Sequence, residues 1–150
     1  MKRTTLCYIK QDDSYLLLFR NKKQHDENEG KWVGVGGKVE EGETPEQCLL
    51  REVKEETGLT LTSYKFHGII GFHSDEWEDE DMYLYSADAF TGALVPECPE
   101  GTLRFVARDE VLSLPMWEGD KYFLAPLLRG DETIKMDLFY EGEKLKKVEK

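Results

Sequence analysis

The segment from Thr44 to Gly58 constrains the fold more than any other part of this 150-residue chain. Thr44 is a favourable N-cap, Pro45 suits the first position of a helix, and Gln47 completes a capping-box pattern. Gly58 is a typical C-terminal stop, because glycine adopts the left-handed conformation that ends many helices. The pattern therefore predicts one helix between Thr44 and Gly58.

The two faces of this predicted helix differ in chemistry. Three apolar side chains form a face suited to burial: Leu49, Leu50 and Val53. Three carboxylates share another face, because they are spaced by three and four residues: Glu52, Glu55 and Glu56. Carboxylates this close repel one another, and hard divalent cations, which prefer oxygen ligands, would relieve that repulsion. The helix is expected to pack on one side and bind metal on the other.

Length and charge narrow the classes of function. A chain of this length suits one domain, residues 1–150, and 39% hydrophobic residues is too high a content for a disordered chain. The formal net charge of -11 disfavours nonspecific binding to nucleic-acid backbones or anionic membranes, because no basic excess displaces their counterions. Bound metal ions can still attract a small anion. We therefore expect a small-molecule substrate, with no nucleic-acid polymer and no membrane as partner.

The cysteines and the apolar runs indicate the compartment. The three cysteines are widely spaced and contain no CxxC pair, which disfavours a zinc ribbon or a disulfide framework: Cys7, Cys48 and Cys98. Reduced thiols of this kind are typical of cytosolic proteins. No apolar run is long enough for a signal peptide or a membrane span. We expect a cytoplasmic protein, as a monomer or a homodimer.

The remaining segments predict strands on both sides of the helix. Alternating, β-branched or aromatic residues favour strands over residues 4–9, 15–19, 32–35, 59–72, 82–90, 103–107, 134–140 and 145–148. The acidic segment 73–81 is expected to be a solvated loop, and 95–101 an irregular link. A short helix is expected over 109–114 and an amphipathic one over 117–128. This order predicts an α/β (α+β) fold, with a mixed β-sheet between helices on both faces.

Residues 37–59 contain a longer pattern, G-x5-E-x7-R-E-U-x-E-E-x-G-U, in which U is apolar. Nine positions match it: Gly37, Glu43, Arg51, Glu52, Val53, Glu55, Glu56, Gly58 and Leu59. On this pattern the segment is identified as the complete signature of the Nudix hydrolases. The resemblance implies the Nudix fold and hydrolysis of a nucleoside diphosphate linked to another group.

The resemblance also implies roles for the residues of the signature. It implies that Glu52, Glu55 and Glu56 hold Mg²⁺, with Mn²⁺ as an alternative, and that the backbone carbonyl of Gly37 joins them. Arg51 would orient the glutamates, and Glu43 would form an ion pair with Arg51. A metal held by carboxylates neutralises a diphosphate and orients water for in-line attack. A merely solvated helix face is the alternative for the three glutamates.

The likeness extends beyond the signature to GKWVGVGGKVEEGETPEQCLLREVKEETGL (30–59), EGTLRFVARDEVLSLPMWEGDKYF (100–123) and the closing hairpin. Together these segments resemble the MutT-type 8-oxo-dGTP diphosphatases. The resemblance implies that Glu100 is a metal ligand or general base, and that Trp117 and Asp120 stack on and hydrogen-bond a purine. It also implies that Lys23 lies near the phosphates, and Phe72 is a candidate pocket residue. The alternatives are a loop carboxylate, a core Trp beside a surface Asp, a solvated lysine and a core aromatic.

Two positions depart from the human member of this group. Val33 replaces its base-contacting asparagine, and Gly119 precedes Asp120 where the human enzyme has two adjacent aspartates. Both changes remove groups that read the purine edge. The expected reaction converts 8-oxo-dGTP to the monophosphate and pyrophosphate, with Glu56 or Glu100 as the base. The alternatives are ADP-ribose, a dinucleoside polyphosphate or capped RNA as substrate, or a catalytically silent nucleotide sensor.

Overall fold

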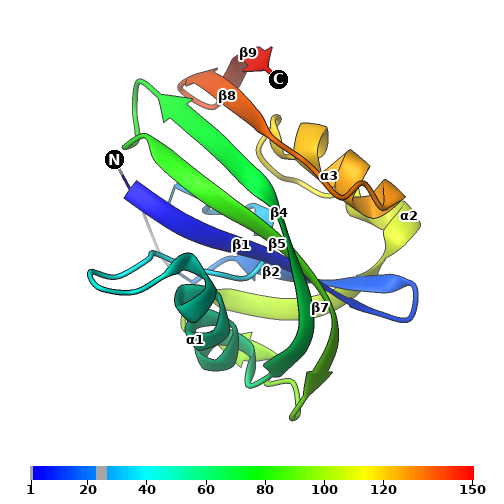
Figure 1. Cartoon of the computed structure of the whole chain (residues 1–150). Coiled ribbons are helices and arrows are strands. Elements are labelled where there is room, and N and C mark those ends of the chain that lie inside the picture. Colours follow the sequence, from blue (N-terminus) through cyan, green and yellow to red (C-terminus); the bar gives the residue numbers. More distant parts are fainter. Residues whose placement is uncertain (1, 23–26) are drawn as a thin grey trace.

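The computed structural model describes residues 2–22 and 27–150 of the chain (Figure 1). Lys23, the predicted phosphate contact, lies outside these residues. The strands are β1 (Lys2–Gln11), β2 (Ser14–Arg20), β3 (Trp32–Val33), β4 (Thr60–Ser74), β5 (Glu80–Thr91), β6 (Glu97–Cys98), β7 (Gly101–Ala107), β8 (Met136–Glu141) and β9 (Lys144–Glu149). The helices are α1 (Pro45–Thr57), α2 (Arg108–Val111) and α3 (Asp120–Arg129).

Nine strands in the described part of the chain form one sheet, in the order β6-β7-β2-β1-β5-β4-β8-β9, with β3 pairing with β2. β1 runs parallel to β5, and β4 runs parallel to β8. The other neighbouring pairs are antiparallel. The sheet is therefore mixed, as predicted.

The helices cover opposite faces of this sheet (Figure 1). Side chains alternate along a strand, so neighbouring residues of β1 point to opposite faces. Cys7 and Ile9 lie in the hydrophobic cluster that contains Leu49 of α1, whereas Tyr8 lies in the cluster that contains Phe123 of α3. This arrangement of a mixed sheet between helices confirms the predicted fold class.

The central helix has the predicted bounds and caps. The backbone N–H of Gln47 donates to Oγ1 of Thr44 at 3.1 Å, and the Gln47 side chain accepts from the Thr44 N–H at 2.9 Å. Gly58 ends the helix with φ of 81°, a left-handed conformation that favours glycine. Leu49 and Val53 are fully buried. The sheet thus holds α1 by its apolar face, which orients its acidic face.

Both late helices are shorter than predicted. α2 ends at Val111 rather than residue 114, and α3 begins at Asp120 rather than at Trp117. A tertiary contact replaces the first predicted turn of α3: the Gly119 N–H donates to the Tyr140 hydroxyl at 2.6 Å. Glycine also has a low helix propensity, so this contact meets little resistance. Trp117 therefore lies before α3 rather than in its first turn, and its side chain is buried as predicted.

The strands differ from the prediction at three places. β3 ends at Val33, and Val35 forms only an isolated bridge with Cys7. Residues 97–98 form the short strand β6 within the expected irregular link. The acidic segment 73–81 is not wholly a solvated loop, because β4 continues to Ser74 and Glu80 is buried at the start of β5. Parallel pairing of Lys2 with Glu80 explains this burial, since it draws Glu80 into the sheet.

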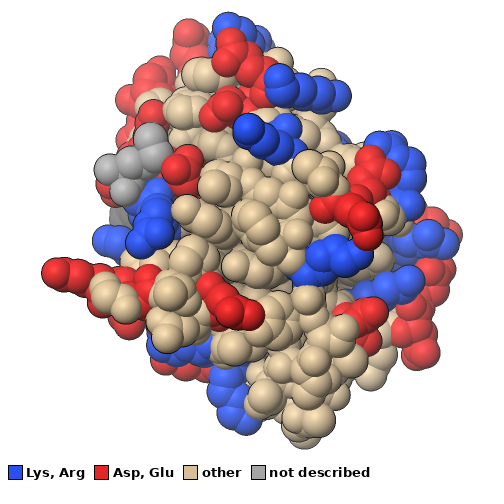
Figure 2. Space-filling view, in the orientation of Figure 1, with Lys and Arg blue, Asp and Glu red and all other residues tan. Residues whose placement is uncertain are grey.

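The thiols are buried, and the charged side chains on one face of the protein are mixed in sign. All three cysteines are buried and free of disulfides. On the face shown in Figure 2, Lys and Arg side chains of the described residues are interspersed with Asp and Glu and form no continuous basic surface. Over residues 2–22 and 27–150, no helix is long and apolar enough to span a membrane.

Candidate active site

Arg51 links the carboxylates of the signature. Its Nε donates to Oε2 of Glu43 at 2.7 Å and its Nη2 donates to Oε1 of the same carboxylate at 3.0 Å, a bidentate pair. Nη1 donates to Oε1 of Glu52 at 2.7 Å and to Oε2 of Glu55 at 3.3 Å. The hydrogen bonds from Arg51 lower the pKa of Glu43 to about 2. The expected pair between Arg51 and Glu43 is thus present, and Arg51 also holds two of the three predicted metal ligands.

The loop Gly36–Gly37 lies directly against the acidic face of α1. A Cβ at Gly37 would lie 2.4 Å from Cδ of Glu52, and one at Gly36 would lie 2.0 Å from the backbone oxygen of Thr5. Gly36 has no room for a side chain because backbone atoms lie too close, whereas a side chain at Gly37 would displace the Glu52 carboxylate. The Gly36 N–H donates to Oε1 of Glu56 at 3.1 Å, so this close approach positions a carboxylate. The loop therefore brings one backbone N–H to the carboxylate cluster, while the Gly37 carbonyl accepts from the Thr5 N–H at 2.9 Å.

Glu56 lies in the least exposed environment of the three glutamates. It is 6% exposed, and this burial raises its pKa to about 8. The negative charges of Glu52 and Glu100 raise the pKa further, while the Gly36 N–H and the charge of Arg20 oppose the shift. Glu100, in the turn between β6 and β7, thus lies within electrostatic range of α1. The fold has brought the late glutamate of the sequence to the signature helix.

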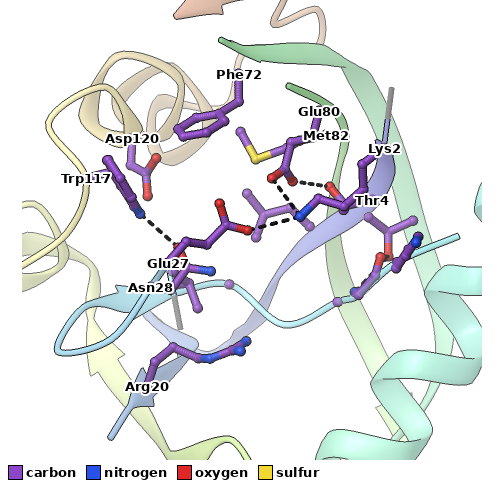
Figure 3. A pocket seen from close by; sticks show the side chains of 17 residues that line it. Lys2, Thr4, Arg20, Glu27, Asn28, Phe72, Glu80, Met82, Trp117 and Asp120 are labelled. Atoms are coloured by element: carbon purple, nitrogen blue, oxygen red, sulfur yellow. Dashed lines mark hydrogen bonds and ion pairs between the residues drawn. The ribbon is translucent and has the colours of Figure 1, made fainter. Parts of the chain in front are cut away.

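A cavity of about 260 Å³ opens beside this cluster (Figure 3). Its lining includes the loop residues Gly36 and Gly37 at one part and the aromatic rings of Phe72 and Trp117 at another. The Phe72 and Trp117 rings pack edge to face, with centroids 5.4 Å apart and planes at 78°. One cavity therefore connects the carboxylate cluster to an aromatic wall.

Trp117 is held rigidly in that wall. Its Nε1 donates to Oδ1 of Asn28 at 2.9 Å, and its ring packs edge to face against Tyr140 at 4.9 Å between centroids. The ammonium group of Lys31 lies 4.6 Å from the centre of the same ring, a cation–π contact. Asp120, one turn further along, is 8% exposed and also lines the cavity. Burial raises the pKa of Asp120 to about 8, the nearby charge of Glu80 adds to this effect, and Lys31 opposes it.

Comparison with known protein families identifies the family to which this chain belongs. The family model described as the NUDIX domain matches residues 1–127. The chain belongs to the Nudix family. Its members are hydrolases that generally use divalent metal ions and act on small-molecule nucleotide substrates.

Three relatives of this Nudix hydrolase cover most of its length. An uncharacterised Nudix hydrolase of Bacillus subtilis is 31% identical over 150 residues, which is 95% of this chain and 89% of that protein. The oxidised purine nucleoside triphosphate hydrolase of mouse is 32% identical over 126 residues, 83% of this chain and 78% of that enzyme. The crystal structure of the mutator MutT protein of Bacillus halodurans superposes with a TM-score of 0.88, at 31% identity over 99% of this chain and 96% of that one.

The donor atoms of the site fit a divalent metal ion. The side chains that the family resemblance assigns to the metal all present carboxylate oxygens, the ligands that hard cations prefer. Burial raises the pKa values of Glu52 and Glu56, the charges of neighbouring carboxylates add to this effect, and a cation would oppose both. In the described ranges no three acidic, histidine or cysteine side chains form a ready-made cage, because Arg51 draws Glu52 and Glu55 toward itself.

The structure brings most of the predicted site residues together. The three signature glutamates, Arg51, Gly37 and Glu100 meet beside the glycine loop, while Phe72, Trp117 and Asp120 line the adjoining cavity. Val33 and Gly119 lie at or beside the cavity, where neither provides a side chain that can hydrogen-bond a base.

Sequence reasoning missed several polar residues of the cavity of this Nudix hydrolase. These are Lys2, Thr4, Arg20, Glu27, Asn28 and Glu80, which come from two strand starts, a strand end and a loop (Figure 3). None of them lies in a recognisable motif. A pairing of β1 with the start of β5 would have located Lys2 and Glu80, but that parallel pairing joins residues 78 positions apart.

Proposed function

We propose that this Nudix hydrolase converts 8-oxo-dGTP, or a related oxidised purine deoxynucleoside triphosphate, to the monophosphate and pyrophosphate in a Mg²⁺-dependent reaction. One observation carries this proposal: a single cavity joins an aromatic wall to the glycine loop on the carboxylate cluster. An aromatic wall suits a purine ring, and a metal-binding cluster suits its phosphates. Such an enzyme would remove oxidised nucleotides from the pool before they enter DNA.

The carboxylate cluster would provide the chemistry of hydrolysis. Glu52, Glu55, Glu56 and Glu100 would hold the metal ion together with the carbonyl of Gly37. When bound, Mg²⁺ or Mn²⁺ would neutralise the phosphates and lower the pKa of water. Glu56 is the preferred proton acceptor, because it is buried beside the glycine loop and the Gly36 N–H holds its Oε1 in place. Glu100 is the alternative base.

Basic side chains would position the substrate's phosphates. Arg20 lines the cavity and lies close enough to Glu56 to lower its pKa, so it is placed to contact a phosphate beside the metal. Lys23 follows three residues later, and its phosphate contact stays a prediction. Arg51 would keep the glutamates oriented through its contacts with Glu43 and Glu52.

The other end of the cavity would hold the base. Phe72 and Trp117 provide ring surfaces, and Asp120 provides a carboxyl group whose raised pKa keeps it protonated at neutral pH. A protonated carboxyl group both donates and accepts, so it can pair with a purine edge that has an N–H beside an acceptor. The similarity to the mouse oxidised purine nucleoside triphosphate hydrolase over 83% of this chain supports this choice of substrate class.

A substrate panel tests the proposal. Purified protein with Mg²⁺ is assayed on 8-oxo-dGTP, dGTP, 2-hydroxy-dATP, ADP-ribose and diadenosine polyphosphates, and the products are identified by chromatography. We expect kcat/KM for 8-oxo-dGTP to exceed that for dGTP by at least about 10-fold, which corresponds to about 1.4 kcal/mol. A chelator should abolish turnover and added Mg²⁺ should restore it. Equal rates on 8-oxo-dGTP and dGTP, or a preference for ADP-ribose, would contradict the proposal.

A further inference from the structure

Three charged side chains meet inside the cavity that lies beside the carboxylate cluster. Nζ of Lys2 donates to Oε1 of Glu27 at 3.1 Å and lies 3.6 Å from Oε1 of Glu80. Oε2 of Glu80 accepts from Oγ1 of Thr4 at 2.8 Å. Figure 3 shows both carboxylates converging on the Lys2 ammonium group, in the cavity that Phe72 and Met82 also line. We call these three residues the Lys2–Glu27–Glu80 cluster.

The sheet holds most of this cluster in place. Lys2 pairs with Glu80 in the parallel register of β1 and β5, and the Lys2 N–H donates to the Asp79 carbonyl at 3.2 Å. The side chains of Lys2, Glu27 and Glu80 are 21%, 18% and 10% exposed. Burial lowers the pKa of Lys2, but the charges of Glu80 and Glu27 outweigh that effect and the net shift is upward. Lys2 therefore remains an ammonium ion beside two carboxylates.

Stability alone does not account for this arrangement. Charged groups removed from water lose hydration that their mutual attraction often fails to repay. Asp120 is 8% exposed and lines the same cavity, where its carboxyl group is accessible to a ligand. Buried polar groups normally have partners, so a ligand in the cavity is the natural partner of Asp120.

We propose that the Lys2–Glu27–Glu80 cluster, together with Asp120, selects bases in which a carbonyl oxygen adjoins an N–H, the edge of guanine and of 8-oxopurines. This inference rests on the proposed function, because it assigns the base to the same cavity. An ammonium group has three donors and no acceptor, so Lys2 would bind the carbonyl oxygen. Ionised carboxylates only accept, so Glu27 and Glu80 would bind the adjoining N–H.

The same arrangement disfavours a base with an amino group in place of the carbonyl. The N–H donors of adenine's amino group would then face the N–H donors of Lys2, and a buried charge would lose its partner. The cluster also supplies polar groups to a cavity in which Val33 and Gly119 supply none from their side chains. Recognition of the base is thereby assigned to the start of β1, the loop before β3 and the start of β5.

Substitution of two cluster residues tests this assignment. Lys2→Met removes the ammonium group at nearly constant length, and Glu80→Gln removes the charge at constant shape. Arg3→Met is the matched control, because Arg3 follows Lys2 on β1, is exposed and does not line the cavity. Each protein carries any tag at its C-terminus, so that Lys2 keeps its surroundings. Circular dichroism and thermal unfolding establish that each variant folds.

Calorimetric binding of 8-oxo-dGMP and dAMP without metal provides the readout. We expect Lys2→Met and Glu80→Gln each to weaken 8-oxo-dGMP binding by about 10- to 100-fold, the range for a lost hydrogen bond to a charged group. Binding of dAMP should weaken by less than about 3-fold in either variant or become tighter, and Arg3→Met should match the wild type for both ligands. An 8-oxo-dGMP affinity within about 2-fold of the wild type in both cluster variants would overturn the inference.

The binding assay also separates this inference from the proposed function. Loss of 8-oxo-dGMP binding in the cluster variants supports the inference even when the substrate panel reveals cleavage of another nucleotide. Hydrolysis of 8-oxo-dGTP with a wild-type KM in both variants leaves the proposed function standing and removes the role of the cluster. A wild-type protein that binds 8-oxo-dGMP no better than dAMP also overturns the inference.

Discussion

At the scale of single residues, three glutamates of one helix occupy three different environments. The side chains of Glu52 and Glu55 are 18% and 60% exposed and both contact Arg51, whereas Glu56 is 6% exposed as a residue and accepts from the Gly36 N–H. Burial costs a charged group its hydration, which is why the pKa of Glu56 rises to about 8. Burial thus gives Glu56 a higher pKa than a glutamate exposed to water has.

Glu56→Gln tests the role that this environment favours. The amide keeps the shape of the side chain but can neither accept the proton of water nor bind a metal ion as a carboxylate does. We expect Mg²⁺-dependent turnover to fall by at least about 100-fold, the scale of general acid–base catalysis, while the unfolding temperature is unchanged or higher. Glu41→Gln, on the exposed loop before α1, is the control and should keep wild-type turnover. Wild-type turnover in Glu56→Gln would exclude Glu56 as an essential group.

At the scale of elements, α1 connects stability to the site. Its buried side chains Leu49 and Val53 fix it to the sheet, and its acidic face is thereby directed at the glycine loop. The N-terminal cap is exposed, and its two hydrogen bonds join only Thr44 and Gln47. The cap should therefore contribute to stability more than to catalysis.

Thr44→Ala separates these two contributions. The substitution removes the hydroxyl oxygen that accepts from the Gln47 N–H. We expect the free energy of unfolding to fall by about 1 kcal/mol, as measured by urea denaturation, with turnover nearly unchanged at temperatures where the protein is folded. Thr44→Ser retains the acceptor and should restore most of the loss. An undiminished free energy of unfolding in Thr44→Ala would show that the capping box does not stabilise the protein.

At the scale of the whole molecule, His73 of β4 contacts residues beside or on the two strands that flank β4 in the sheet, β5 and β8. Its Nδ1 lies 2.9 Å from Oδ2 of Asp79, just before β5, and its Nε2 lies 2.8 Å from Oδ1 of Asp137 on β8. Burial lowers the pKa of His73, but the hydrogen bonds to Asp137 and Asp79 outweigh it and the net shift is upward. When His73 is protonated, its imidazolium ion bridges two carboxylates.

This bridge predicts a pH-dependent contribution to stability. Because the folded-state pKa of His73 lies above its ordinary value of 6.5, the contribution is fully present below that value and is lost as the pH rises through the folded-state pKa. We expect His73→Gln to lower the unfolding temperature more at pH 6 than at pH 9. His67→Gln, a control on the same strand, should show no such difference of this origin, because Glu132 O and Ser86 Oγ, not carboxylates, contact its ring. An equal loss at both pH values in His73→Gln would contradict the prediction.

Local patterns predicted much of this architecture and the signature part of the candidate site, but not the polar lining of the cavity. The capping residues, the glycine stop and the apolar face of α1 depend on interactions within a few residues, so they could be predicted from the sequence. The same holds for the strand segments, whose alternation follows from the pleat of a sheet. Long-range contacts could not be predicted from local patterns. Tyr140 determines where α3 begins, and pairing with β1 buries Glu80.

The sequence by itself determined the family, the capped helix and the spacing that places three carboxylates on one face, because all of these lie within one short segment. Only the tertiary structure decided that Glu56 is buried while Glu55 is exposed, since exposure depends on what packs against α1. It also decided that Lys2, Glu27 and Glu80 meet in one cavity with Asp120. Sheet pairing and loop packing join residues far apart in the chain, and no local pattern encodes those contacts.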